Sequence, residues 1–132
     1  MRKSVVRIPE FQSWIEKAGV PLSLVVRHGP VVYVSGMPPI VPNSTSLLIG
    51  TVKEQTVQVL TNLEVCLRAV NLDFASVLKC TIYSCNAAHF PVINEVYREF
   101  FQTDPPARTF CTVGSWPAAF DVEIDCIAGF SE

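Results

Sequence analysis

Arg108 and Glu123, two charged residues near the C-terminus, are the strongest candidates for a catalytic pair in this sequence. Arg108 lies in a β-type run over residues 107–113, and Glu123 lies in a second run over 120–130. The short connection at 114–117 predicts a hairpin, so we expect both side chains on the sheet face not covered by helices. An arginine fork holds a carboxylate through two parallel hydrogen bonds. A nearby carboxylate positions a water or shuttles a proton. This pair would suit hydrolysis of a small anionic molecule.

The same pair has a purely structural alternative. Arg108 and Glu123 would form a cross-strand ion pair at a subunit interface. Because structural ion pairs are common beside functional ones, spacing alone favours this alternative. The sequence contains no GxSxG, Walker, GxGxxG or HExxH motif, so the common hydrolase, nucleotide and zinc-protease signatures are absent.

The elements that must position these residues follow from hydrophobic periodicity. Apolar residues at three- and four-residue steps predict helices over about 50–71 and 88–101. Two β-branched runs around His28-Gly29-Pro30 predict a hairpin. The other predicted elements are strands at 3–7 and 76–84 and a brief helix at 10–18. In the terminal strand polar and apolar residues alternate, which indicates a sheet covered on one side only.

These elements predict an α+β fold in a single domain, residues 1–132. Its architecture is a two-layer sandwich, in which a mixed β-sheet carries two helices on one face. Hydrophobic residues make up 49% of the chain and charged residues 17%, a composition that excludes intrinsic disorder.

Charge and hydropathy narrow the expected partners. The net charge is −2 and no basic run of five residues occurs, so we expect no nucleic-acid binding. Apolar stretches fall far short of the ~20 residues that cross a bilayer, so we expect no membrane partner. The N-terminal residues show no apolar region typical of a signal peptide, and the C-terminus carries no lipidation signal. We therefore expect a cytoplasmic location.

The five cysteines predict buried, reduced thiols rather than a metal or disulfide framework. Their number is odd, no CxxC occurs, and each lies in an apolar or periodic segment. The two histidines, His28 and His89, are far apart in sequence. Since metal sites need clustered ligands, we expect no metal.

Two C-terminal segments carry a resemblance to a known family. Pro106-Ala107-Arg108-Thr109, followed by Val122-Glu123-Ile124, resembles the C-terminal signature of the Rid family, also called the YjgF or L-PSP family of reactive-intermediate deaminases. Residues 31–36 resemble the family's apolar strand ending in Ser-Gly, and residues 93–101 resemble its second helix. The likeness runs in register over about residues 21–128.

The resemblance implies a fold, an assembly and an activity. The fold would be of the chorismate-mutase type, and three subunits would close their sheets into a barrel-like core with clefts between neighbours. Deaminases of this family hydrolyse enamines and imines, such as 2-aminoacrylate, to a 2-keto acid and ammonia. They use neither a metal nor an organic cofactor. The implied partners are a small carboxylate substrate and two further copies of the chain.

The resemblance also assigns roles to individual residues. Arg108 would clamp the substrate carboxylate, and Glu123 would position the water that attacks the imine carbon. Ser35 and the backbone around Phe110 would line the pocket, and Gly36 would let the chain pass close to the ligand. An imine is already electrophilic, so orientation and one polarised water suffice for this chemistry.

Asn94 also matches a family position, with the alternative of a helix side chain that ties down a neighbouring loop. Three positions depart from the archetypal deaminases: Phe110 replaces a Cys, Leu22 replaces a Tyr, and Met37 replaces a common Gln. These changes make the pocket more apolar. They keep two alternatives open: a deaminase for a bulkier aminomuconate-type degradation intermediate, and a non-catalytic trimer that binds small carboxylates. The ribonuclease activity claimed for some relatives fits this acidic chain poorly.

Overall fold

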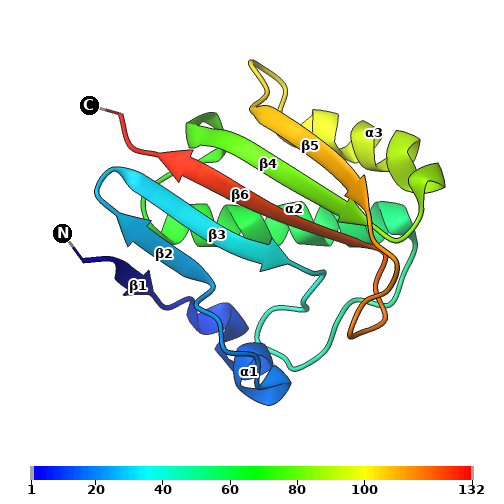
Figure 1. Ribbon diagram of the computed structural model, residues 1–132, viewed down its shortest axis with the longest axis horizontal. Coiled ribbons are helices and arrows are strands. Elements are labelled where there is room, and N and C mark those ends of the chain that lie inside the picture. The colour runs from blue at the N-terminus through cyan, green and yellow to red at the C-terminus, as the bar shows by residue number, and fades with distance from the viewer. Residues whose placement is uncertain (1, 132) are drawn as a thin grey trace.

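The computed structural model, which describes residues 2–131, is built around one six-stranded sheet (Figure 1). Its strand order is β1-β2-β3-β6-β4-β5. The strands are β1 (Ser4–Val6), β2 (Val25–His28), β3 (Val31–Met37), β4 (Val77–Ser84), β5 (Ala107–Thr112) and β6 (Val122–Gly129). All neighbours are antiparallel except β4 and β5, which are parallel, so the sheet is mixed.

Three α-helices accompany the sheet: α1 (Pro9–Ala18), α2 (Val52–Ala69) and α3 (Phe90–Phe100). Two 3₁₀ turns, η1 (Phe74–Ser76) and η2 (Ala87–His89), precede β4 and α3. Helix α2 begins with a capping box: the Glu54 amide donates to Thr51 Oγ1 at 3.1 Å, and the Thr51 amide donates to Glu54 Oε1 at 2.9 Å. These bonds satisfy two amides that the first helical turn leaves unpaired, which fixes where α2 starts.

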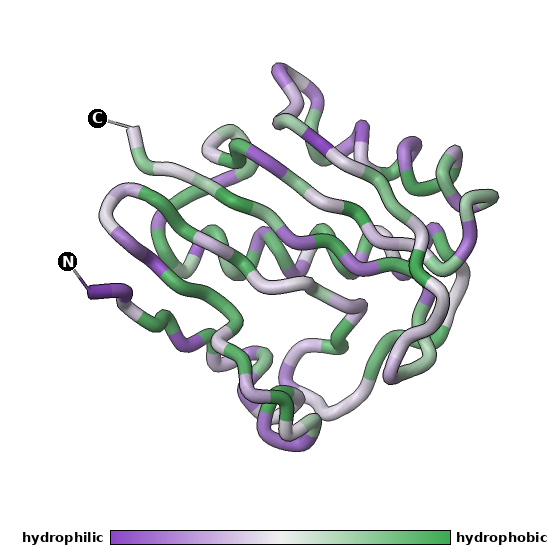
Figure 2. The backbone as a smooth tube through the Cα atoms, in the orientation of Figure 1, coloured by the Kyte–Doolittle hydropathy of each residue, from purple (hydrophilic) through white to green (hydrophobic). Residues whose placement is uncertain are grey.

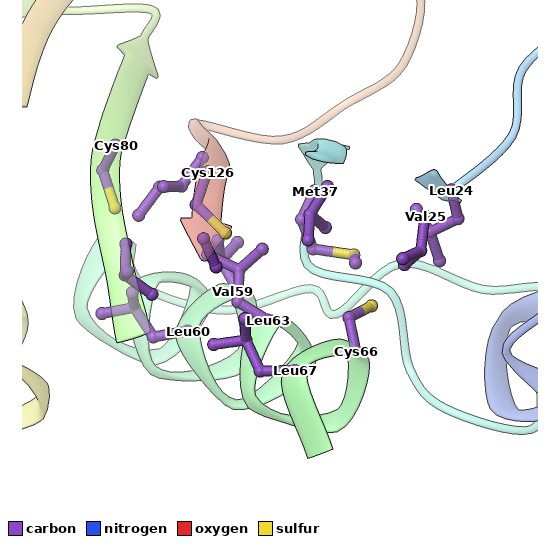
Figure 3. Close-up of a cluster of buried hydrophobic side chains, with 14 of the residues drawn as sticks. Leu24, Val25, Met37, Val59, Leu60, Leu63, Cys66, Leu67, Cys80 and Cys126 are labelled. Carbon is purple, nitrogen blue, oxygen red and sulfur yellow. The ribbon is translucent and has the colours of Figure 1, made fainter. Parts of the chain in front are cut away.

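The hydrophobic core lies between the sheet and α2. Figure 3 shows strand side chains such as Cys80 and Cys126 on the side of the sheet that faces α2, above Leu60 and Leu63 of the helix, all of them buried. Along β6 buried residues alternate with partly exposed ones, and Figure 2 shows the first half of the strand as alternating green and purple bands. One face of the sheet is therefore packed, and the other carries the polar residues.

Most predicted elements are confirmed, and the fold is α+β with a mixed sheet. Helices α2 and α3 fall within the predicted ranges. Helix α1 also contributes to the hydrophobic core, because its Phe11 is fully buried there. Among residues 2–131 no helix is long and apolar enough to cross a membrane.

The predicted hairpin between β5 and β6 is wrong. Strand β4 lies between them: it pairs in parallel with β5 and antiparallel with β6, and β6 also pairs with β3. The physical reason lies in the residues of β6, whose apolar side chains at 122, 124, 126 and 128 are at most 2% exposed. A strand this apolar is best buried at the centre of the sheet, with both edges paired. Residues 113–121 therefore form a connection around the end of the sheet rather than a tight turn.

Candidate functional site

Arg108 lies on the edge strand β5, on the side of the sheet that the helices cover. Its register partner on β4 is the fully buried Cys80. Arg108 Nη2 donates a 2.6 Å hydrogen bond to Asn94 Oδ1 of α3. The guanidinium carbon also lies 4.9 Å from the Tyr97 ring centroid and 5.5 Å from that of Phe90. An amide oxygen and two aromatic faces therefore hold the cation in one position.

The guanidinium retains donors for a ligand. Among residues 2–131 no carboxylate forms an ion pair with Arg108, and Asn94 Oδ1 is its one hydrogen-bond acceptor there. Burial raises the pKa of the Tyr97 phenol, so this ring stays neutral beside the cation. A cavity of about 330 Å³ opens between α3 and the start of β5, with Arg108 and Asn94 in its wall. Arg108 can thus receive a ligand carboxylate through its free N–H groups.

Glu123 lies on the opposite face of the sheet. Its register partner on β4 is Tyr83, three residues from the partner of Arg108, and side chains an odd number of residues apart on a strand point to opposite faces. Burial, and to a lesser extent the charge of Asp125, raises the pKa of the Glu123 carboxyl. Tyr83 donates a hydrogen bond to Asp125 at 3.2 Å, whereas no side chain within residues 2–131 pairs with the Glu123 carboxylate.

Gly36 makes room for this carboxylate. A Cβ placed on Gly36 would overlap with Glu123 Oε1 and lie 2.9 Å from Glu123 Cδ. The two residues are brought together by an irregularity of β3 between Val34 and Met37, opposite β6. Any larger residue at position 36 would displace the carboxylate, so glycine is needed here for its size.

The Glu123 side chain reaches a cavity of about 510 Å³ with mostly apolar walls. Leu22, Ile40 and Phe120 contribute apolar surface, while Lys17 adds a second charged residue to the lining. Apolar surroundings disfavour the charged form of a carboxyl group and so raise its pKa. The cavity therefore combines an apolar binding surface with a proton acceptor.

The other predicted pocket residues divide between the two regions. Ser35 lies next to Gly36; its hydroxyl donates to the Ser23 carbonyl at 2.7 Å and its amide to Leu24 at 2.8 Å, so it fastens β3 to the preceding segment. Phe110 lies on the helix side with Arg108, and its ring meets that of Phe90 edge-on at 4.8 Å. Leu22 lines the larger cavity, whereas Met37 is fully buried in the core.

The structure thus separates residues that the sequence placed together. Arg108, Asn94 and Phe110 form one group, which we call the arginine half-site. Ser35, Gly36 and Glu123 form the other, the glutamate half-site. The expectation that Arg108 and Glu123 meet on one face of a single chain is wrong, because β4 intervenes and the side chains point to opposite faces. A cross-strand ion pair within one chain is excluded for the same reason.

Asn94 contacts Arg108 itself rather than tying down a loop. The aromatic neighbours of Arg108 were not identified from the sequence. Phe90, Asn94 and Tyr97 follow one another at steps of four and three residues, which places them on one face of α3. The spacing alone does not show that these residues surround Arg108. That inference also requires knowing that α3 packs beside β5.

The fold is that of a small α+β domain, and it carries two charged half-sites on opposite faces of its sheet. The model of the family described as Endoribonuclease L-PSP matches residues 15–130. The chain belongs to this family, the Rid or YjgF family.

Its relatives include two named deaminases. The 2-iminobutanoate/2-iminopropanoate deaminase of Bos taurus is 36% identical over 108 residues, which cover 82% of this chain and 79% of that protein. The chloroplastic Reactive Intermediate Deaminase A of Arabidopsis thaliana is 34% identical over 108 residues. That alignment covers 82% of this chain and 58% of the plant protein, so the match spans little more than half of the longer relative.

Solved structures show the same fold. YyfA from Yersinia pestis, described as a protein of unknown function of the conserved Rid protein family, superposes with a TM-score of 0.89 at 31% identity, covering 98% of this chain and all of that one. TdcF of E. coli, determined with bound serine, gives a TM-score of 0.80 at 30% identity, covering 85% of this chain and 90% of its own. The arrangement of sheet and helices is therefore that of the family.

Proposed function

We propose that the protein is a deaminase that hydrolyses small carboxylate-bearing imines and enamines, of the 2-aminoacrylate type, to 2-keto acids and ammonia. We further propose that the reaction takes place in clefts between the subunits of a homotrimer. The observation that carries this proposal is the pair of half-sites. Each presents a charged group that finds no charged partner among residues 2–131, and the two groups point to opposite faces of one sheet.

A cleft between copies supplies what one chain lacks. The arginine half-site lies at the β5 edge, and the glutamate half-site lies on the uncovered face. If one copy places its β5 edge against the uncovered face of the next, the Arg108 of the first faces the Glu123 of the second. That face also carries exposed apolar groups, Tyr33 at 48% and Leu78 at 56% exposure, which association would bury.

The chemistry follows from the two groups. Arg108 binds the substrate carboxylate through its free N–H donors, which places the imine carbon at a fixed distance from Glu123. The Glu123 carboxylate accepts a proton from a water as that water attacks the carbon of the C=N bond. The resulting carbinolamine loses ammonia after its nitrogen receives a proton, leaving the 2-keto acid. An enamine first takes up a proton on carbon to become the imine.

The raised pKa of Glu123 suits this role. A carboxylate with a raised pKa is a stronger base, so it removes the proton of the attacking water more readily and returns it to the leaving nitrogen. Relatives support the substrate class: the bovine protein is named for 2-iminobutanoate and 2-iminopropanoate, and TdcF was determined with bound serine, an amino acid that carries a carboxylate.

A separate observation supports a second candidate function, the binding of small carboxylates without turnover. Leu22 and Phe110 stand where archetypal deaminases carry polar groups, and the larger cavity is mostly apolar. A trimer that binds small carboxylates without turning them over would need Arg108 but not Glu123. Turnover therefore separates the two candidates.

The proposed function is tested with imines that are generated within the assay mixture. A serine or threonine dehydratase releases the unstable enamine or imine, and the protein is added while keto-acid formation is followed. An imine panel should include bulkier members, such as an aminomuconate-type compound, because the cavity has room for them. The proposal predicts faster keto-acid release than the spontaneous rate. No acceleration on any member, with 2-ketobutyrate still bound, would reject the deaminase and select the binding protein.

A further inference from the structure

A second group of reactive side chains lies outside both half-sites. Cys85, His89 and Asp121 each offer one ligand atom, and these atoms all lie within 4.8 Å of one another. Cys85 is exposed, while His89 and Asp121 are partly buried. The cysteine and histidine come from the segment between β4 and α3, and Asp121 comes directly before β6. The group therefore brings together a thiol, an imidazole and a carboxylate at one end of the sheet.

Strand pairing creates this cluster. Ser84 and Val122, the last residue of β4 and the first of β6, are register partners, and the Cys85 amide donates to the Asp121 carbonyl at 3.3 Å. Asn86 then turns the chain by accepting a 2.8 Å hydrogen bond from the Ala88 amide. This turn returns His89 toward the thiol, and the Cys85 Sγ–H already donates to Asp121 Oδ1 at 3.2 Å.

The carboxylate is held from behind by a buried glutamine. Gln55, which is 4% exposed, donates from Nε2 to Asp121 Oδ2 at 2.7 Å and accepts from the Asp121 amide at 2.8 Å. Its Nε2 also donates to the Gly50 carbonyl at 2.9 Å, which fixes the glutamine itself. Asp121 Oδ2 is thus engaged and Oδ1 faces the cluster. Hydrogen bonds of this kind orient carboxylates in metal sites.

The imidazole is oriented in a similar way. The fully buried Ser84 donates its hydroxyl proton to the Asn86 carbonyl at 3.1 Å, so toward His89 Nδ1, 3.3 Å away, its oxygen acts as an acceptor. This assignment places the imidazole proton on Nδ1 and leaves the lone pair on Nε2. A neutral imidazole with one fixed nitrogen is the form that binds metals.

An unsatisfied donor beside the cysteine is a separate indication. The indole N–H of Trp116 is buried and has no hydrogen-bond partner among residues 2–131, and it lies near Cys85. A thiol sulfur is a weak acceptor, whereas a metal-bound thiolate is a stronger one. Metal binding at Cys85 would therefore give this N–H a stronger acceptor.

We propose that Cys85, His89 and Asp121 form a binding site for a transition-metal dication of the Zn²⁺ type. Tetrahedral zinc with bonds of 2.0–2.3 Å places its ligand atoms roughly 3.5 Å apart, so small side-chain movements would complete the site. The sulfur and nitrogen donors favour Zn²⁺ or Co²⁺ over Mg²⁺ or Ca²⁺, which prefer oxygen ligands. The exposed side of Cys85 leaves a fourth position for water. On binding, the thiol proton passes to solvent and the Cys85–Asp121 hydrogen bond is replaced by two metal bonds.

Cobalt titration of the reduced full-length protein tests this site without reference to activity. Co²⁺ should bind at one site per chain, with the visible bands of tetrahedral cobalt and a near-ultraviolet band from the sulfur–cobalt bond. Added Zn²⁺ should remove both. Cys85→Ser and His89→Ala should each weaken binding by more than the roughly 10–100-fold that loss of an outer-shell partner costs.

Cys111→Ser is the matched control, because Cys111 is the other cysteine whose side chain is not buried and it is not among the clustered ligands. This variant should bind Co²⁺ as the wild type does. The proposal is overturned if saturation produces no sulfur–cobalt band, or if the band persists unchanged in Cys85→Ser.

Discussion

The arginine and glutamate half-sites hold their charges in opposite ways. Arg108 is surrounded by groups that favour its charged form and its position: the Asn94 oxygen at 2.6 Å and the faces of Tyr97 and Phe90. Glu123 is surrounded by groups that disfavour its charged form, namely an apolar cavity and the neighbouring Asp125. In the proposed mechanism, Arg108 is therefore preorganised for binding and Glu123 is kept basic for proton transfer.

This contrast follows from the place of each residue in the sheet. Arg108 is on an edge strand, where α3 packs beside it and supplies polar and aromatic partners. Glu123 is on a central strand, and the neighbour that its carboxylate overlies is Gly36, which has no side chain to stabilise it. The proposed mechanism thus places binding and proton transfer in two separate environments.

Removal of the Glu123 carboxylate should have the largest effect. Glu123→Gln keeps the shape of the side chain but cannot accept a proton, so kcat for imine hydrolysis should fall by about 10²–10⁴-fold. This fall in kcat is measured as the rate of keto-acid release when a dehydratase generates the imine. Glu64→Gln, at a partly exposed residue of α2 that pairs with Arg68, is the control and should behave as the wild type. If Glu123→Gln retained wild-type kcat, the glutamate half-site would have no role in proton transfer.

Removal of the guanidinium should have the next largest effect. Arg108→Ala deletes the carboxylate clamp, so kcat/KM should fall by about 30–150-fold, equivalent to about 2–3 kcal/mol. Arg68→Ala removes a solvent-exposed arginine of α2 and serves as the control. Acceleration that survives Arg108→Ala would contradict the proposed clamp.

Asn94 sharpens the comparison, because it acts through Arg108. Asn94→Ala removes one hydrogen bond, so KM should rise by about 2–10-fold while kcat changes little. Asn94→Asp should raise KM further, since its carboxylate would pair with Arg108 and compete with the substrate. A merely structural asparagine would give the two variants the same KM and would change their thermal stability instead.

The smallest effect concerns stability. A carboxyl whose pKa is raised by folding contributes stability that is present below its unfolded pKa, about 4.3, and is lost as pH rises through the folded pKa. At pH 7 the Glu123 carboxyl therefore contributes less stability than it does near pH 4. Glu123→Gln should have a higher Tm than the wild type at pH 7, and this advantage should shrink as the pH approaches 4. A difference in Tm that does not vary with pH would show that folding does not raise the pKa of this carboxyl group.

Local patterns predicted the elements but not their neighbours. The capping residue Thr51 and the apolar periodicity of α2 are encoded within a few turns of chain, and so is the alternation in β6. Which strands pair depends on contacts between distant segments. The period of a strand does not reveal whether β5 or β4 will lie beside β6.

The same limit applies to the sites. Arg108 and Glu123 were found from residue type and spacing, and Asn94 from the family resemblance. Their division between two faces depends on β4 lying between β5 and β6. The expectation of no metal rested on two distant histidines. It overlooked that β4–β6 pairing brings Asp121 beside Cys85 and His89. Cytoplasmic location stays a prediction, and one of the relatives is a chloroplastic protein.

A subunit-mixing experiment tests the cleft between copies most directly. Arg108→Ala and Glu123→Gln are each assayed alone, then unfolded together in equal amounts and refolded, with wild type carried through the same procedure. In a ring where Arg108 of one copy faces Glu123 of the next, random assembly restores both residues in about one quarter of the clefts. We predict recovery of about a quarter of the refolded wild-type activity. A mixture no more active than its two components would contradict a site shared between subunits.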